Sequence, residues 1–396
     1  MGKYKYWFLC MAAFPLLLFG CSAKPYATIG SDQTKIPNQT ITSQESLPPL
    51  VLIDSDKQQE SPAPSSDETE EPGLTKDSFT LLFAGDVLLS DHVLNAYDQA
   101  GGIHGVLDTA YQDRIAHTDF FLVNQEFPFS SRGNAAPDKQ YTFRLPPERI
   151  SIFQEMGIDG VTLANNHALD FGTDALLDSC NFLDQAGIFH TGAGADLESA
   201  RQPITIQGKG GKIAVIGATR VIPVSSWAAG KQHPGMLAAY DMTVLLEEIQ
   251  TRKKDHDFVI VYIHWGIERD ESPQEYQRTM ARQMIDAGAD LIVGSHPHVL
   301  QGIEYYKGKG IVYSLGNFVF GSSIPRTTLL EVTWNLSREE DSLPTLRLIP
   351  GTSSAGYTRM LTDTNKQKEF FQYMESISFD VKIGEDGILY PLFPHS

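Results

Sequence analysis

Cysteine, positive charge and long apolar runs are all scarce in this chain of 396 residues. Its three cysteines stand at positions 10, 21 and 180, which excludes a disulfide-rich scaffold and a zinc site built from paired cysteines. Lys and Arg number 31 against 49 Asp and Glu, so the formal net charge is −18. The longest basic cluster is the trio 252–254. We therefore expect no nucleic-acid partner, because an acidic protein repels a phosphate backbone.

The amino terminus has the pattern of a targeting segment. Lys3 and Lys5 precede about a dozen apolar residues, fewer than the ~20 that span a bilayer and typical of a signal peptide. The stretch ends in LFGC at 18–21, which resembles a bacterial lipoprotein box. That box implies removal of residues 1–20, lipidation of Cys21 and an extracytoplasmic protein tethered to the cell membrane. The alternatives are a plain secretory signal or an uncleaved anchor.

The composition then divides the chain into three parts. Residues 21–77 are rich in Ser, Thr, Pro, Gln and acids, so they bury too little apolar surface to fold, and we expect a flexible acidic stalk. Residues 78–350 are expected to form one large domain, with residues 351–396 as an extension packed on it. Cys180 lies in a helical pattern and is interpreted as a buried small apolar residue.

Apolar strands alternate with helical patterns throughout the large domain. This alternation favours an α/β layered fold with buried sheets. The strands are expected at 79–86, 119–126, 158–166, 211–220, 257–266 and 288–298, and the clearest helices at 147–157, 175–187 and 276–288.

Strand after strand in this pattern ends in a residue type that binds metals. Ligands bind at the carboxyl edge of open α/β sheets, so these side chains are expected to converge in one crevice. A single polar residue after a strand is usually a cap or a turn residue, but here the coincidence recurs five times. The residues are Asp86, Asn124 with Glu126, Asn165 with Asn166 and His167, His264, and His296 with His298.

The donor atoms of this set suit a divalent first-row metal. Carboxylate and amide oxygens with imidazole nitrogens fit Mn²⁺, Fe²⁺ or Zn²⁺, as one ion or two. Glu126 has the carboxylate needed to bridge two metals. His167 is the candidate proton donor to a leaving oxygen, with Asp170 close enough to orient it. The alternatives without a metal site are a surface loop at His296–His298 and a polar turn at 165–167.

Seven ordered motifs between about residues 79 and 321 resemble the CapA family. These bacterial proteins are associated with poly-γ-glutamate capsule synthesis and are similar to calcineurin-like metallophosphoesterases. The motifs are FAGDVLL, VNQEFPF, YTFRLPPE, LANNHALDFG, YIHWGIE, GADLIVGSHPHVLQGIE and YSLGNFVFG.

The resemblance implies a fold, a site and a role. The fold is a layered β-sandwich flanked by helices (α-β-β-α). His167 matches the catalytic histidine, and the role is capsule synthesis or export beside a polyglutamate ligase and transport subunits. The implied metal ligands are Asp86, Glu126, Asn166, His264, His296 and His298.

Two positions depart from the phosphoesterase pattern, and one arginine has two interpretations. Leu88 stands where those enzymes have a histidine, and Glu126 replaces an aspartate, which weakens one site of a dinuclear pair. His92 either substitutes for the missing histidine ligand from a more distant position or is a surface residue. Arg144 either clamps a carboxylate or phosphate of an anionic substrate or forms a structural ion pair. A metal-dependent hydrolase of an anionic envelope polymer or precursor is the alternative function.

Overall fold

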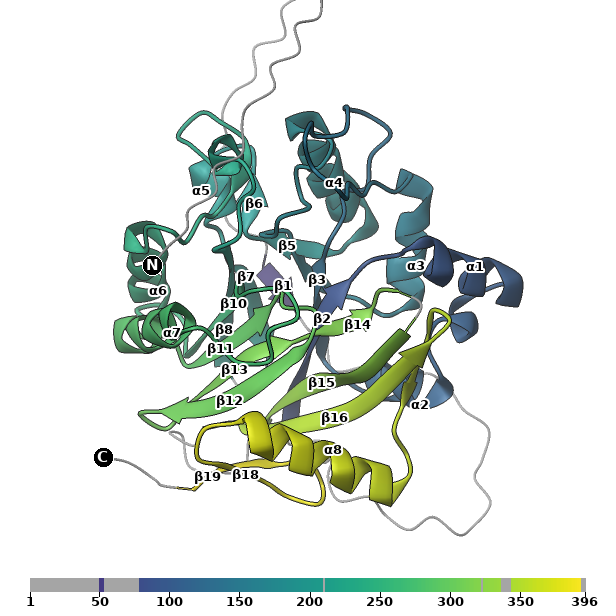
Figure 1. The fold of residues 1–396 in the computed structure, drawn as a ribbon. Helices are drawn as coiled ribbons and strands as arrows, with labels where there is room; N and C mark the ends of the chain where they lie inside the picture. Colours follow the sequence, from purple (N-terminus) through teal and green to yellow (C-terminus); the bar gives the residue numbers. More distant parts are fainter. Residues whose placement is uncertain (1–49, 53–77, 209–210, 322, 336–342, 393–396) are drawn as a thin grey trace, which may run out of the picture. The chain divides into compact units, whose positions relative to one another are not determined.

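Two large β-sheets form the framework of the described part of the chain. The computed structural model describes residues 50–52, 78–208, 211–321, 323–335 and 343–392. One sheet has seven strands and the other has eight (Figure 1). The predicted signal peptide and Cys21 lie outside the described residues, as does the predicted stalk except for Leu50–Leu52.

The seven-stranded sheet is parallel at its centre, where β8, β10, β11 and β13 run the same way. Its order is β1 (Leu50–Leu52), β7 (Ile204–Gly208), β8 (Gly211–Thr219), β10 (Phe258–His264), β11 (Leu291–Ser295), β13 (Lys309–Leu315) and β12 (Leu300–Tyr306).

The eight-stranded sheet combines an antiparallel half with a parallel half. Strands β2 to β5 are parallel, and β15 and β16 are antiparallel to their neighbours. The order is β17 (Tyr357–Met360), β16 (Thr345–Ser354), β15 (Ser323–Asn335), β2 (Ser78–Val87), β3 (Phe120–Gln125), β4 (Gly160–Thr162) and β5 (Phe189–Thr191), with β14 (Asn317–Val319) beside β2.

Successive side chains of a strand point to opposite faces of its sheet, and in this way the strands contribute to three apolar layers. Strand β2 is an example. Phe79, Leu81 and Phe83 share a buried cluster with residues of both sheets. Leu82 and Ala84, on the other face, share a cluster with residues of the first four helices. A third cluster joins the outer face of the seven-stranded sheet to α6 and α7. The order is therefore helix, sheet, sheet, helix, and the predicted fold class is confirmed.

The helices cover the outer faces of the sheets and one end of the sandwich (Figure 1). Phe370 and Met374 of α8 are buried in the cluster between the sheets. Among the described residues, none of the helices is both long and apolar enough to cross a bilayer. The helices are α1 (Asp91–Ala100), α2 (Thr109–Ala116), α3 (Ile150–Glu155), α4 (Thr173–Ala186), α5 (Leu197–Ala200), α6 (Thr243–Arg252), α7 (Glu275–Ala287) and α8 (Thr364–Ile377).

The carboxyl-terminal part of the chain is continuous with the eight-stranded sheet. The predicted boundary between residues 350 and 351 falls inside β16, which pairs with β15 and β17 on its two sides. Beyond β17 come α8 and a hairpin of β18 (Val381–Ile383) and β19 (Leu389–Pro391). Residues 351–354 therefore belong to the sheet, and the packed extension follows it.

Cys180 of α4 is the free cysteine in the described part of the chain. Its side chain packs against the apolar cluster between the eight-stranded sheet and its helices. Burial raises the pKa of the thiol to about 12. Cys180 thus packs as a small apolar residue, but it is partly buried, whereas the sequence predicts a buried one.

Gly85 is required where the two sheets approach each other at the end of β2. A Cβ atom at this position would lie 1.8 Å from the carbonyl oxygen of Gly316. That oxygen also accepts a hydrogen bond from the amide of Asp86, at 2.8 Å. The close approach therefore fixes the position of Asp86.

We predict that Gly85→Ala destabilises the protein by about 1–3 kcal/mol, because the added methyl group displaces backbone that has no room to move. Chemical denaturation with fluorescence detection measures the change. Gly321→Ala is the control, since no atom lies within 4 Å of its added Cβ. Equal stability of the two variants would contradict the prediction.

Candidate metal centre

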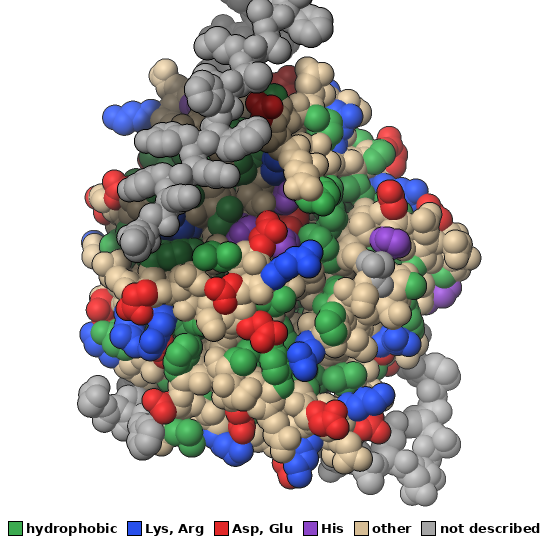
Figure 2. Space-filling model, in the orientation of Figure 1, with side chains coloured by type: hydrophobic (Ala, Val, Ile, Leu, Met, Phe, Trp, Pro, Cys, Tyr) green, Lys and Arg blue, Asp and Glu red, His purple; other side chains and the backbone are tan. Residues whose placement is uncertain are grey.

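The ends of parallel strands from both sheets bring the predicted ligands together. Asp86 lies near the end of β2, and Glu126 follows β3 directly. His264 is the last residue of β10, and the turn after β11 carries His296 and His298. In Figure 2 histidine side chains are visible beside acidic ones near the middle of the face drawn.

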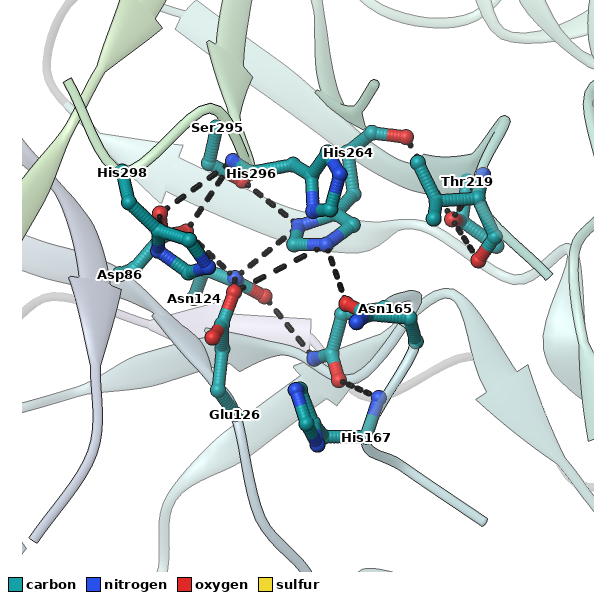
Figure 3. Close-up of polar contacts among 12 residues, drawn as sticks. Asp86, Asn124, Glu126, Asn165, His167, Thr219, His264, Ser295, His296 and His298 are labelled. Carbon is teal, nitrogen blue, oxygen red and sulfur yellow. Dashed lines mark hydrogen bonds and ion pairs between the residues drawn. The ribbon is translucent and has the colours of Figure 1, made fainter. Parts of the chain in front are cut away.

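Asp86, Glu126 and His298 form the centre of the site, which we call the carboxylate–histidine cluster. One ligand atom from each residue lies within 4.8 Å of the others. The Nδ1 atom of His298 is 3.2 Å from Oδ2 of Asp86. Both carboxylate side chains are fully buried, and all three residues point toward one another in Figure 3.

Asn124 holds the two carboxylates together from the end of β3. Its Nδ2 atom donates to Oδ1 of Asp86 at 2.8 Å and to Oε1 of Glu126 at 3.1 Å. The same nitrogen is 3.2 Å from Nδ1 of His264. An amide donor between two buried carboxylates offsets part of their mutual repulsion. The sequence places Asn124 at a strand end, but it does not show this bridging role.

His264 and Asn166 form the wall of the site opposite His298. The Nε2 atom of His264 lies 2.8 Å from Oδ1 of Asn166 and 3.7 Å from Oε1 of Glu126. Asn165 instead supports this wall, because its Nδ2 donates to the side chain of Asn124 at 3.0 Å. The two neighbouring asparagines therefore have different surroundings.

His296 lies beside this wall in a strained backbone conformation. Its φ of 98° is in the left-handed region, which costs a non-glycine residue of order 1–3 kcal/mol. Its ring centroid is 4.6 Å from that of His264. Its backbone amide is 3.3 Å from both carboxylate oxygens of Asp86. The strain is therefore accompanied by a contact that helps to hold Asp86 in place.

Burial and neighbouring charges give the cluster unusual acidities. Burial and the charge of Asp86 raise the pKa of Glu126 well above its usual range. Burial alone would raise the pKa of Asp86, but the hydrogen bond and charge of His298 hold it below its usual value. Burial opposes protonation of His298, yet the two carboxylates outweigh it and raise its pKa to about 10. The cluster therefore attracts positive charge.

The donor set fits a divalent cation. Two carboxylates and an imidazole converge, and these are ligand types that Mn²⁺, Fe²⁺ and Zn²⁺ accept. Among the described residues, Oε2 of Glu126 and Nδ1 of His296 are buried without a hydrogen-bond partner. Buried polar atoms are rarely left unpaired, because the lost solvation costs about 1–3 kcal/mol. A cation at the cluster would give such atoms a partner.

His167 lies next to the cluster with its predicted partner, Asp170. The Nδ1 atom of His167 is 2.7 Å from Oδ2 of Asp170. The ring of Phe143 packs on the imidazole, with centroids 4.5 Å apart. Asp170 is completely buried and also accepts from the amide of Phe143 at 2.8 Å. This arrangement orients the imidazole of His167.

Lys139 is a component of the site that the sequence does not reveal. Its ammonium group bonds to Oδ1 of Asp170 and to the carbonyl oxygen of Asn166. It also lies 3.0 Å from Nδ1 of His167. Burial lowers the pKa of Lys139 despite its ion pair with Asp170. Lys139 lies in the polar segment AAPDKQ, which looks like an ordinary solvent-exposed loop.

Arg144 has structural contacts. Its Nη1 atom donates to the carbonyl oxygens of Arg132 at 2.7 Å and Gly133 at 3.1 Å. The guanidinium also lies 4.0 Å above the ring of Phe171. Arg144 therefore braces the loop that carries Lys139 through backbone carbonyls. Among the described residues it forms no ion pair, and its role as a substrate clamp stays a prediction.

Leu88 and His92 are not members of the carboxylate–histidine cluster. Leu88 is 5% exposed and packs in the apolar layer beneath α1. His92 is exposed on the first turn of α1. Asn317, in contrast, lies beside the cluster and places its Oδ1 2.8 Å from Nδ1 of His298.

Comparison with known proteins identifies relatives of this chain. Residues 80–322 match the family described as bacterial capsule synthesis protein PGA_cap. The PGA biosynthesis protein CapA of Bacillus subtilis is 36% identical over 256 residues, covering 63% of this chain and 66% of the relative. The capsule biosynthesis protein CapA of Bacillus anthracis is 32% identical over 263 residues, covering 63% and 62%. The chain thus spans slightly less than two thirds of either relative.

A solved structure gives a weaker likeness. A 5'-nucleotidase from Candida albicans matches with a TM-score of 0.36 and 13% identity, over 70% of this chain and 52% of that one. The family match carries the assignment, since it covers more than half of the chain and includes every predicted metal ligand. The chain belongs to the bacterial capsule synthesis protein family PGA_cap, within the metallophosphoesterase-like superfamily.

Proposed function

We propose that this protein is a membrane-tethered accessory of poly-γ-glutamate capsule synthesis or export that works with a divalent metal. The observation that carries the proposal is the buried carboxylate–histidine cluster inside the segment that matches the capsule synthesis family. The names of the two Bacillus relatives support the capsule role. The pattern of residues 1–21 supports tethering outside the cytoplasm through a lipid on Cys21.

Asp86, Glu126 and His298 would hold the metal, with His264, His296 and Asn166 as further ligands. When bound, a divalent cation supplies Lewis-acid polarisation of a substrate oxygen. The protein's own side chains prepare the site: Asn124 fixes both carboxylates, and burial excludes water from them. A polyglutamate ligase and transport subunits are the partners this role requires.

Metal binding is tested by the substitution Glu126→Gln. The amide removes a negative charge and a strong donor oxygen, so we expect the affinity for Mn²⁺ to fall about 100-fold. Isothermal titration calorimetry of the full chain measures the change. Glu331→Gln is the control, because Glu331 is also buried, on β15, but pairs with Arg114 outside the cluster. Equal Mn²⁺ affinity of both variants and the wild type would overturn the metal proposal.

The capsule role is tested in cells. Deleting the gene should abolish surface poly-γ-glutamate, and the wild-type gene should restore it. The polymer is quantified in washed cells by glutamate release after acid hydrolysis. Complementation with Glu331→Gln should succeed and with Glu126→Gln should fail, because only the latter alters the cluster. A deletion strain with a normal capsule would refute the role.

The hydrogen bond between His167 and Asp170 favours a second candidate function. This function is that of an extracytoplasmic phosphoesterase or other hydrolase of an anionic envelope polymer or precursor. Asp170 accepts a hydrogen bond from Nδ1, so Nε2 is the atom left to exchange a proton with a leaving oxygen. Lys139 fixes the carboxylate of Asp170 and thereby the plane of the imidazole ring.

Turnover of bis(p-nitrophenyl) phosphate by the Mn²⁺-loaded full chain tests the hydrolase. His167→Ala should lower kcat by about 10²–10⁴-fold, the contribution of a general acid, without changing Mn²⁺ affinity. His117→Ala, an exposed histidine at the end of α2, should keep full activity. If the Mn²⁺-loaded wild type hydrolysed neither this substrate nor any of a panel of wall-derived phosphodiesters, this candidate would be excluded. The accessory role would be unaffected.

A further inference from the structure

Arg220 stands at the same sheet edge as the candidate metal centre. It follows Thr219, the last residue of β8, and Thr219 is the register partner of His264 on β10. The backbone amide of Arg220 donates to the carbonyl oxygen of His264 at 2.8 Å. Figure 3 shows Thr219 beside His264, so the next residue begins the loop that leaves this edge.

The side chain of Arg220 is held between two tyrosine rings. Its guanidinium carbon lies 4.1 Å from the centroid of Tyr240 and 4.8 Å from that of Tyr276. The hydroxyl of Tyr276 accepts a hydrogen bond from the amide of Gly266, two residues after His264. Stacking on aromatic faces restrains a guanidinium but uses none of its N–H donors. Arg220 is therefore positioned and still able to donate.

Within the described part of the chain, no carboxylate balances the charge of Arg220. In the described ranges, neither an ion pair nor a side-chain hydrogen bond involves its guanidinium, whereas Arg114, Arg132 and Arg201 each pair with an acidic residue. Its side chain is half-buried, and Tyr240 is 57% exposed. A stacked, partly exposed arginine whose backbone adjoins His264 of the candidate metal centre is conspicuous in a chain with a net charge of −18.

We propose that Arg220 binds an anionic group of the substrate, a carboxylate of a polyanionic chain, while a neighbouring part of that chain lies at the carboxylate–histidine cluster. This rests on the proposed function and names the residue that selects the anion. The planar guanidinium presents paired donors that match a carboxylate. A negatively charged polymer needs such a fixed cation, because the protein's overall field repels it. The phosphate groups of a wall polymer offer the same chemistry.

The test measures equilibrium binding of fluorescent poly-γ-glutamate, and separately of polyphosphate, to the full chain in saturating Mn²⁺. We expect Arg220→Met to weaken the preferred polymer about 10-fold or more, with Mn²⁺ affinity unchanged. Arg220→Lys keeps the charge but loses the paired donors, so its loss should be smaller. The matched control is Arg359→Met, an exposed arginine near Tyr357 on β17, three strands away from β2 in the sheet order.

The polymer that binds more tightly identifies the anion as carboxylate or phosphate. Either result supports a site at Arg220 if Arg220→Met weakens binding of that polymer and Arg359→Met does not. Equal losses in Arg220→Met and Arg359→Met would overturn the proposal, since they would reflect net charge alone. Wild-type affinity in Arg220→Met, or binding of neither polymer by the wild type, would also overturn it. Mn²⁺ titrations on the same samples separate these outcomes from failure of the metal proposal. Arg220→Lys provides the comparison if Arg220→Met does not fold.

Discussion

Two fully buried carboxylates facing each other impose the main constraint on this structure. Asp86 and Glu126 lie too close for both to be charged without compensation, and the protein surrounds them with His298, Asn124 and the backbone amide of His296. These groups come from strands of both sheets. The packing of one sheet on the other is thus coupled to charge balance at a single point, and the left-handed backbone at His296 is part of that arrangement.

The same constraint explains why the site has an inner and an outer part. The inner part, around the carboxylates, is buried because the strands on which it stands are buried on both faces. The outer part is carried by loops, where Lys139 reaches His167 and Arg220 stacks between tyrosines. On the proposed function, the inner part would hold the metal and the loops would contact the polymer.

The sequence predicted the layered fold and the residues at the strand ends, because buried strands leave a strong apolar pattern and their polar termini interrupt it sharply. For Arg144 it left a substrate clamp and a structural ion pair open, and it did not show the hydrogen bonds from the guanidinium to carbonyls of its own loop. It gave no sign of Lys139, since a lysine in a polar segment looks the same whether it faces solvent or Asp170. The bridging amide of Asn124 and the stacking of Arg220 depend on contacts between residues far apart in the chain, which local patterns do not encode.

The position of β2 has a consequence for how the chain is made. β2 pairs with β3 about 40 residues later and with β15 about 250 residues later, at the registers Leu81–Phe120 and Leu81–Val332. During synthesis, the backbone N–H and C=O groups of β2 on the side of β15 therefore lack their strand partner until most of the chain has emerged. Exposed strand edges pair with other chains, and long-range pairing is slow. In a nascent chain of this topology, that edge is therefore a surface at risk of aggregation until β15 has been made.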